Sequence, residues 1–323
     1  MAGDSRSRAK SLTKAVSRFA PSPTGRLHLG HAWSALLAHD FARARGGTFL
    51  LRIEDVDPGR ARPEHVEGIF GDLAWLGLAW DDEPVFQSRR LPLYAGALDR
   101  LKAMDLVYPC FCTRSAIAAE IAASASAPHG PDGPLYPGTC RGLFLGERTA
   151  RMAEPHAWRL DMSKALSLFP GESRGPGADS ELDPGLRRVA LSWTNNGREI
   201  IAEPELFGDV VLARKDAPTS YHLAVTVDDA AQGVTDVVRG RDLFAATHVH
   251  RLLQALLGLP TPEYHHHPLL LDAEGRRLAK RHGAPTLQSL RESGADPAEL
   301  VAALRTGRLP AGYSASSAQG PDP

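Results

Sequence analysis

The spacing of apolar residues over the first hundred positions predicts strands and helices in alternation. Residues 16–20 form a short apolar run, and residues 28–45 carry Leu, Trp and Phe at helical spacing until two glycines end the helix. Residues 48–54 then have the pattern of a buried strand. A strand–helix–strand unit of this kind is the nucleus of a parallel doubly wound sheet, so we expect an α/β, Rossmann-like fold.

The rest of the chain is less regular. Residues 107–140 break the pattern, and residues 163–187 are rich in Gly, Pro, Ser and Asp, which predicts a surface loop or insert. Residues 221–229, taken as bare pattern, predict a strand followed by a loop. The further elements that we expect are helices over 63–76, 91–106 and 243–257, a regular segment at 208–214 and a strand-like segment at 264–271.

These changes of pattern divide the chain into segments. We expect one α/β domain in two halves, with a cysteine-bearing subdomain inserted between them and a basic loop and short helical stem after them. The halves are 16–107 and 206–260, the insertion is 108–205, the loop and stem are 261–310, and disordered tails occupy 1–15 and 311–323.

Composition is that of an ordinary soluble protein, with 43% hydrophobic and 23% charged residues in 323. No apolar run reaches the roughly 18 residues that a membrane span needs. The basic N-terminal segment lacks the apolar stretch of a secretory signal, so we expect a cytoplasmic protein. A net charge of −1 argues against a protein that coats nucleic acid in bulk, but it does not exclude a local basic surface.

The junction between the first strand and the first helix offers a site for phosphate. A loop, Pro21–Gly25, runs into a helix that opens with His28 and His31. These imidazoles are three residues apart and share one face of the first turn, where backbone N–H groups can bind an anion. Gly30 has no side chain and lets a ring or ribose approach the backbone. The segment therefore predicts a nucleotide triphosphate site.

The three cysteines, Cys110, Cys112 and Cys140, are sparse and clustered. A low, odd count is typical of a reducing compartment, where close cysteines more often hold a metal than a disulfide. We therefore expect zinc in preference to three unrelated thiols. Three thiolates need a fourth ligand, and ordinary ligand chemistry nominates His129. A closed site of four ligands would be structural.

The loop and helix start resemble the signature of class I aminoacyl-tRNA synthetases, in which a His-x-Gly-His cluster binds ATP. The stretch Arg-Phe-Ala-Pro-Ser-Pro-Thr-Gly at 18–25 is similar to the glutamate-specific branch, whereas glutamine-specific relatives carry Pro and Glu near those places. The resemblance covers about residues 16–290, apart from the insert. It implies that His28 and His31 are catalytic and that ATP contacts Pro21, Thr24, Gly25, His28, Gly30 and His31.

The resemblance also implies a glutamate site. Arg-Ile-Glu-Asp at 52–55 matches the same family, in which the glutamate contacts the α-amino group of the amino acid. A carboxylate is the expected partner of an ammonium, whereas Asp55 and Asp57 are typical of a loop or helix cap. A dicarboxylate substrate needs cations that stay charged, and guanidinium binds carboxylate in bidentate fashion. We place Arg18 on the side-chain carboxylate, and the implied glutamate contacts are Arg18, Ala20, Ser22, Glu54, Tyr221 and Arg239.

A basic loop at 276–281 resembles the Lys-Met-Ser-Lys-Ser loop of the class I synthetases. Lys280 occupies the position of the key lysine, which makes it a third catalytic and ATP-binding residue. The loop departs from the pattern, because Arg277 replaces the first lysine and Ala279 replaces a serine. One hydroxyl contact is lost, so we expect the loop to close less tightly on the triphosphate.

The cysteines carry a more specific resemblance. Cys-x-Cys…Tyr-x3-Cys is the pattern of the glutamyl-queuosine branch, which implies a zinc site of Cys110, Cys112, Tyr136 and Cys140. A tyrosine ligand requires a phenol pKa near 10 to fall sharply. We favour Tyr136 and keep His129 as its rival.

Only 43 residues of the 323 follow Lys280, where discriminating glutamyl-tRNA synthetases carry a large anticodon-binding region. The resemblance thus implies a ligase that activates L-glutamate with ATP and Mg²⁺ without tRNA. It would then transfer glutamate to queuosine in the anticodon of tRNA(Asp). The alternatives are a truncated glutamyl-tRNA synthetase charging tRNA(Glu) and a non-catalytic tRNA- or nucleotide-binding paralogue. We expect a monomer with no membrane or DNA partner.

Overall fold

The structure is a computed structural model. Lys280, Arg277 and Ala279 of the basic loop lie outside the residues that it describes, as do most of the insert predicted at 163–187 and most of both predicted tails. The described residues are 14–123, 129–169, 191–272, 274–276, 278, 285–307, 309 and 312–316. Within them, no helix is long and apolar enough to cross a membrane.

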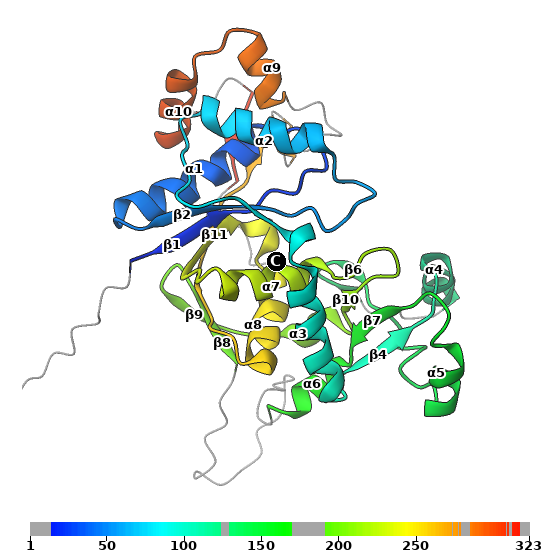
Figure 1. The fold of residues 1–323 in the computed structure, drawn as a ribbon. Coiled ribbons are helices and arrows are strands. Elements are labelled where there is room, and N and C mark those ends of the chain that lie inside the picture. The colour runs from blue at the N-terminus through cyan, green and yellow to red at the C-terminus, as the bar shows by residue number, and fades with distance from the viewer. Residues whose placement is uncertain are drawn as a thin grey trace, which may run out of the picture.

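A sheet in two parts, parallel except for the antiparallel edge strand β9, forms the centre of the molecule (Figure 1). The first part has the order β1-β2-β3 and the second the order β11-β12-β8-β9. The two parts meet where Val16 O accepts a hydrogen bond from Thr235 N at 3.0 Å. The strands are β1 (Val16–Phe19), β2 (Thr48–Ile53), β3 (Val85–Phe86), β11 (Asp236–Gly240), β12 (Glu263–His267), β8 (Ser192–Asn195) and β9 (Arg198–Ile201).

Both faces of this sheet are buried, as the continuous apolar sequence of β2 requires. Phe49, Leu51 and Ile53 pack into one hydrophobic cluster, whereas Leu50 packs into another on the opposite side. Side chains alternate between the faces of a strand, so the two clusters lie on the two sides of the sheet. The predicted α/β class and the strand–helix–strand unit at the N-terminus are confirmed.

Helices cover the two faces (Figure 1). One face is covered by α1 and α2, which also support the C-terminal helices; there Arg291 pairs with Asp72 at 3.2 Å and Arg305 with Asp40 at 2.7 Å. The other face is covered by α3, α7 and α8. The bounds are α1 (Leu29–Ala44), α2 (Pro63–Trp75), α3 (Leu91–Ala103), α7 (Tyr221–Ala231), α8 (Ala246–Leu257), α9 (Leu287–Glu292) and α10 (Pro297–Arg305).

Two expectations about local structure are wrong. Residues 221–229 form the helix α7 and not a strand, because Ser220 caps the helix by accepting from Leu223 N. The β-branched run at 225–227 suggested a strand, but tertiary packing overrides such propensity. Residues 163–167, expected in a loop, belong to α6 (Met162–Ser167), which Asp161 caps by accepting from Lys164 N.

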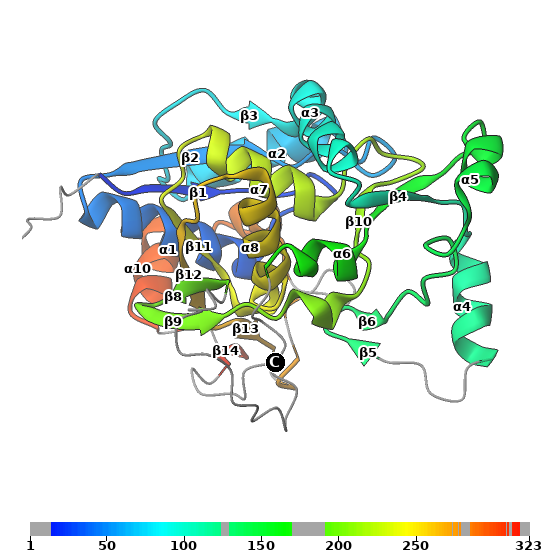
Figure 2. The same ribbon diagram turned by 90° about the horizontal axis from the view of Figure 1, so that it is seen from below.

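The cysteine-bearing segment forms a second sheet with the antiparallel order β10-β7-β4, set to one side of the first (Figure 2). Strands β8 and β9, expected in the inserted subdomain at 108–205, belong instead to the central sheet, where β8 pairs with β12 and β9 pairs with β8. The elements here are β4 (Val107–Cys110), α4 (Arg114–Ala123), β5 (His129–Gly130), β6 (Gly133–Pro134), α5 (Leu145–Arg151), β7 (Ala157–Leu160) and β10 (Val211–Ala213).

Short elements complete the described chain. Gly258 ends α8 in the left-handed conformation, as its place after an amphipathic helix predicts. Residues 314–315, expected in a disordered tail, pair with β13 instead. The remaining bounds are η1 (Gln87–Arg89), η2 (Pro204–Phe207), η3 (Arg241–Leu243), β13 (Leu270–Leu271) and β14 (Ser314–Ala315).

Candidate active site

A cavity of about 320 Å³ opens where β1, β2 and β11 end. The strand order reverses between β1 and β11, and open α/β sheets bind ligands at such a switch point. Eleven of the predicted nucleotide- and glutamate-binding residues line this cavity; Gly25 does not, and Lys280 lies outside the described residues. Those eleven are Arg18, Ala20, Pro21, Ser22, Thr24, His28, Gly30, His31, Glu54, Tyr221 and Arg239.

The two histidines at the start of α1 are locked to each other and to the backbone. His28 is the N-cap residue: its Nδ1 accepts from Gly30 N at 3.1 Å, and His31 Nδ1 accepts from His28 N at 3.1 Å. Each ring therefore carries its proton on Nε2 when it is neutral, since its Nδ1 is an acceptor. The ring centroids are 3.8 Å apart. This arrangement fixes both rings beside the helix N-terminus, where backbone N–H groups can bind an anion.

Gly30 leaves little room for a side chain at this turn. A Cβ at that position would lie 3.0 Å from Cε1 and 3.2 Å from Nδ1 of His28. The absent side chain therefore lets the His28 ring fold back onto the helix start. This is a second use for Gly30 beside the predicted approach of a ligand to its backbone.

Arg18 comes from β1 and is 4% exposed. Its Nε and Nη2 donate to the two oxygens of Asp229 at 3.0 and 3.3 Å. Burial acts to raise the pKa of Asp229, but Arg18 and Arg52 outweigh it and hold that pKa below its usual value. The predicted carboxylate-binding arginine is thus itself held by a carboxylate from α7.

Glu54 follows β2 and lies against the fully buried Arg52, with 3.5 Å between Oε1 and Nη2. Burial raises the pKa of Glu54, although Arg52 and Arg18 oppose the shift. A cation placed against this carboxylate would favour its ionised form. The position therefore suits the ammonium group of an amino acid.

Arg239, at the end of β11, has surroundings of a different kind. It is 5% exposed, and each hydrogen bond that it makes to a described residue goes to a neutral acceptor. Burial, assisted by the charge of Arg239, lowers the pKa of His266 to about 2, so this ring is neutral. A buried cation is costly without an anion. The acceptors are His266 Nε2 at 3.1 Å, Tyr221 Oη at 3.2 Å, Leu243 O at 3.0 Å and Thr247 Oγ1 at 2.6 Å.

Sequence reasoning missed the acidic pair Asp228-Asp229 of α7 and the structural role of Arg52. Asp228 is fully buried and accepts from Gln87 at 2.8 Å and from Tyr94 at 2.7 Å. These residues could have been recognised as charged positions within otherwise apolar elements. Because charged side chains are almost never fully buried unless they are paired, such positions indicate buried ion pairs. This signal was hidden because 221–229 was assigned to a strand.

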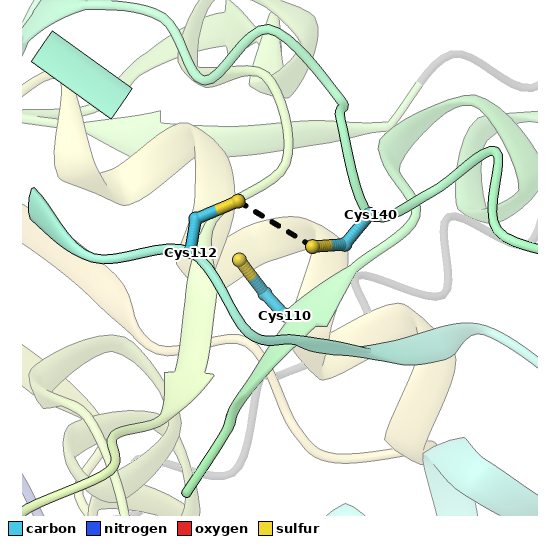
Figure 3. Close-up of side chains that lie close together, drawn as sticks. All are labelled: Cys110, Cys112 and Cys140. Carbon is cyan, nitrogen blue, oxygen red and sulfur yellow. Dashed lines mark hydrogen bonds between the residues drawn. The ribbon is translucent and has the colours of Figure 1, made fainter. Parts of the chain in front are cut away.

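The cysteines converge at the end of β4 (Figure 3). The sulfurs of Cys110, Cys112 and Cys140 all lie within 4.8 Å of one another, and those of Cys112 and Cys140 are 3.4 Å apart. Zinc–sulfur bonds of about 2.3 Å in tetrahedral geometry place sulfurs roughly 3.8 Å apart. Burial raises the pKa of the Cys112 thiol to about 11. A cation would be needed to hold three thiolates there, so the donor set fits zinc.

Tyr136 also lies at this cluster. Its hydroxyl is 3.5 Å from Cys110 Sγ and 3.6 Å from Cys112 Sγ, and it accepts from Cys140 N at 2.8 Å. His129 is exposed in β5 and is not among the residues whose ligand atoms gather within 4.8 Å. Of the two residues weighed as fourth ligand, Tyr136 is the one that contacts the cysteines.

Comparison with known proteins defines the class. A family model described as "tRNA synthetases class I (E and Q), catalytic domain" matches residues 14–166 and 196–316. The chain therefore belongs to this family of ligases, and it is an enzyme of the glutamate–tRNA ligase type.

Curated relatives narrow the position within the family to the glutamyl-Q tRNA(Asp) synthetases, as the cysteine pattern predicted. The chain is 50% identical to the Glutamyl-Q tRNA(Asp) synthetase of Rhodobacter capsulatus over 88% of this chain and 98% of that protein. It is 44% identical to the protein of the same name from Symbiobacterium thermophilum, over 89% of this chain and 84% of the relative.

Solved structures agree on the fold. A glutamate–tRNA synthetase from Elizabethkingia anophelis matches with a TM-score of 0.72 and 27% identity, and covers 91% of this chain. A glutamate tRNA ligase from Elizabethkingia meningosepticum, solved in complex with its amino acid, matches with a TM-score of 0.71 and 27% identity over 91% of this chain. The chain spans only 62% and 61% of the lengths of these two proteins.

Proposed function

We propose that this enzyme activates L-glutamate with ATP in the absence of tRNA and then transfers the glutamyl group to queuosine in the anticodon of tRNA(Asp). The observation that carries the first step is the charge of the cavity. Arg18 already has a carboxylate partner, whereas Arg239 donates to neutral groups among the described residues. Glutamate has a net charge of −1 at neutral pH, so it would match the cation that the described part of the chain leaves uncompensated.

The proposed chemistry needs alignment more than proton transfer. A carboxylate is ionised at pH 7, so no general base is required for its attack on the α-phosphorus of ATP. In this proposal, the attack releases pyrophosphate and forms glutamyl-adenylate. His28 and His31 would donate from Nε2 to the triphosphate, and Lys280 would add positive charge as the reaction proceeds. Mg²⁺, when bound with ATP, neutralises charge on the phosphates.

Glutamate would lie across the cavity between its charged contacts. Glu54 would take the ammonium group, Arg18 the side-chain carboxylate, and Arg239 with Tyr221 the remaining anionic charge. Ala20 and Ser22 line the same wall after β1. The carboxyl group to be activated would then face the histidine-capped start of α1, where ATP is proposed to bind.

We also propose that the cysteine cluster holds one structural zinc ion through Cys110, Cys112, Tyr136 and Cys140. The converging sulfurs and the adjacent phenol support this assignment. The four positions would close the coordination sphere, so the metal would stabilise the subdomain and take no part in the reaction.

The acceptor is the part of the proposal that rests on the names of the relatives. A queuosine hydroxyl would attack the activated carbonyl, forming an ester and releasing AMP. The test is transfer of labelled glutamate to tRNA(Asp) from normal cells and from cells unable to make queuosine. Labelling of the normal tRNA alone supports the proposal. Equal labelling of both preparations contradicts it.

A second candidate is the charging of tRNA(Glu) at its 3′ end, as a short glutamyl-tRNA synthetase. The likeness to solved glutamate–tRNA ligases favours it. The same labelling experiment separates the two functions: label on tRNA(Glu), released by cleaving the 3′ nucleotide, would establish the second candidate and overturn the first.

A further inference from the structure

A series of four side chains with alternating charges links two residues that line the cavity, Arg18 and Glu54. Arg18 pairs with Asp229 at 3.0 Å, and the same Asp229 oxygen accepts from Arg52 Nη1 at 2.8 Å. Arg52 in turn lies 3.5 Å from Glu54. The sequence of charges is therefore cation, anion, cation, anion, with the two outer members lining the cavity and the two inner members behind them.

The four residues of this charge series come from three parts of the fold. Arg18 belongs to β1, Arg52 to β2 with Glu54 directly after that strand, and Asp229 to the last part of α7. Strands β1 and β2 run parallel, with Arg18 opposite Leu50. A contact across the sheet through α7 is therefore what sets the orientation of the Arg18 guanidinium relative to Glu54.

The inner pair is deeply buried. The Arg52 side chain is fully buried and the Asp229 side chain is 7% exposed. Fixed charges of this kind, held from two or more sides, keep side chains in a single geometry, and a displacement of about 1 Å at a binding group can cost on the order of 100-fold. We infer that Asp229 is a positioning residue for amino-acid recognition, holding the Arg18 guanidinium and, through Arg52, the Glu54 carboxylate in register for one substrate.

The inference rests on the proposed activation of glutamate and adds a prediction to it. Arg18 and Glu54 would act as one coupled unit and not as two independent contacts. A change at Asp229, which lines no part of the cavity, would then disturb both ends of the substrate site. ATP contacts would be spared, because His28 and His31 are fixed by their own helix start.

The experiment is glutamate-dependent ATP–pyrophosphate exchange by Asp229→Asn in the full chain. We expect the KM for glutamate to rise about 10- to 100-fold while the KM for ATP stays within about twofold. Asp72→Asn is the matched control, since Asp72 is equally buried but pairs with Arg291 between α2 and α9. It should leave both KM values unchanged.

A second readout separates positioning from general destabilisation. The charged and titratable groups that act on Glu54 are Arg52, Arg18, Asp229 and Asp228, and Tyr221 lies beside it. Removing the negative charge of Asp229 removes an influence that raises the pKa of Glu54, so the acid limb of kcat/KM for glutamate should move to lower pH. A purely structural role would lower activity without moving this limb.

A milder variant covers the case in which Asp229→Asn does not fold. Gln232 Oε1 accepts from Arg52 Nη1 at 2.9 Å at the half-buried end of α7. Gln232→Met removes this acceptor with little change of volume and should raise the KM for glutamate about two- to fivefold. Wild-type activity with unchanged glutamate KM in both variants would refute the positioning role. Absence of glutamate-dependent exchange in the wild type would refute the proposed function instead.

Discussion

The cavity of the candidate active site and the cysteine cluster differ in how their buried polar groups are compensated. The cavity gathers side chains from β1, β2, α7 and β11, and most of its charges are compensated by the protein itself. The cluster draws its four groups from residues 110–140, and its sulfurs lie close to one another, to the Tyr136 hydroxyl and to the backbone N–H of Phe111. We propose that a substrate completes the first region and a metal the second, so damage to each should have a separate signature.

The largest effect is expected at Arg239. Replacing it by Ala removes the cation that the described residues leave without an anion, and should lower kcat/KM for glutamate about 10²- to 10³-fold. The exchange assay measures this loss. Arg239→Lys keeps the positive charge but lacks the planar set of guanidinium donors. Its kcat/KM for glutamate should therefore lie between the values of the wild type and of Arg239→Ala. The metal content should stay at the wild-type value, and a parallel loss of metal would break the separation of the two regions.

A smaller effect is expected at Tyr136. Tyr136→Phe removes the proposed oxygen ligand while keeping the ring, and should weaken zinc binding about 10- to 100-fold in a competition titration with a chelator. His129→Ala is the matched control and should bind zinc as the wild type does. If the effects are reversed, the fourth ligand is His129 after all.

The helix start offers a test of the nucleotide end alone. In Gly30→Ala the new methyl group presses on the His28 ring, which must move by a few tenths of an ångström. We expect the KM for ATP to rise about fivefold to tenfold, with the glutamate KM little changed. A variant with wild-type ATP kinetics would show that the packing of Gly30 against His28 has no bearing on nucleotide binding.

The smallest effect concerns stability and lies outside both regions. Burial raises the pKa of Asp72 to about 6, with Arg291 opposing the shift. The folded protein then binds this proton more tightly than the unfolded chain, so ionisation of Asp72 destabilises the fold as pH rises from about 4 to about 6. Between pH 4.5 and 6.5, Asp72→Asn should remove a fall of about 1–3 kcal/mol in the free energy of unfolding. Parallel urea-denaturation profiles for the two proteins would contradict this assignment.

The sequence predicted the parts of the fold that depend on local pattern. The strand, loop and helix around His28 and the buried strand at 48–54 follow from apolar spacing, and both are present. The helix α7 did not follow, because Val225-Thr226-Val227 favours a strand when packing is unknown. The assignment of 192–201 to the central sheet likewise depends on pairing with β12, where Asn195 lies opposite Tyr264, about 70 residues further along the chain.

The sequence predicted which individual residues line the cavity, but not how they pair with one another. Glu54, Tyr221 and Arg239 were expected near the nucleotide loop, and the structure brings them to one cavity. Their partners were not predicted, because the contact between Arg18 and Asp229 joins residues 211 positions apart. A linear pattern shows which charges exist, whereas only the fold shows which of them are already paired.

We propose above all that the cavity recognises glutamate by its net negative charge and that the enzyme activates it without tRNA. The direct test is ATP–pyrophosphate exchange by the wild-type chain with glutamate and with glutamine, both in the absence of tRNA. We expect exchange with glutamate and a kcat/KM for glutamine lower by about 10²-fold or more. Equal exchange with the two amino acids, or exchange that requires tRNA, would contradict it.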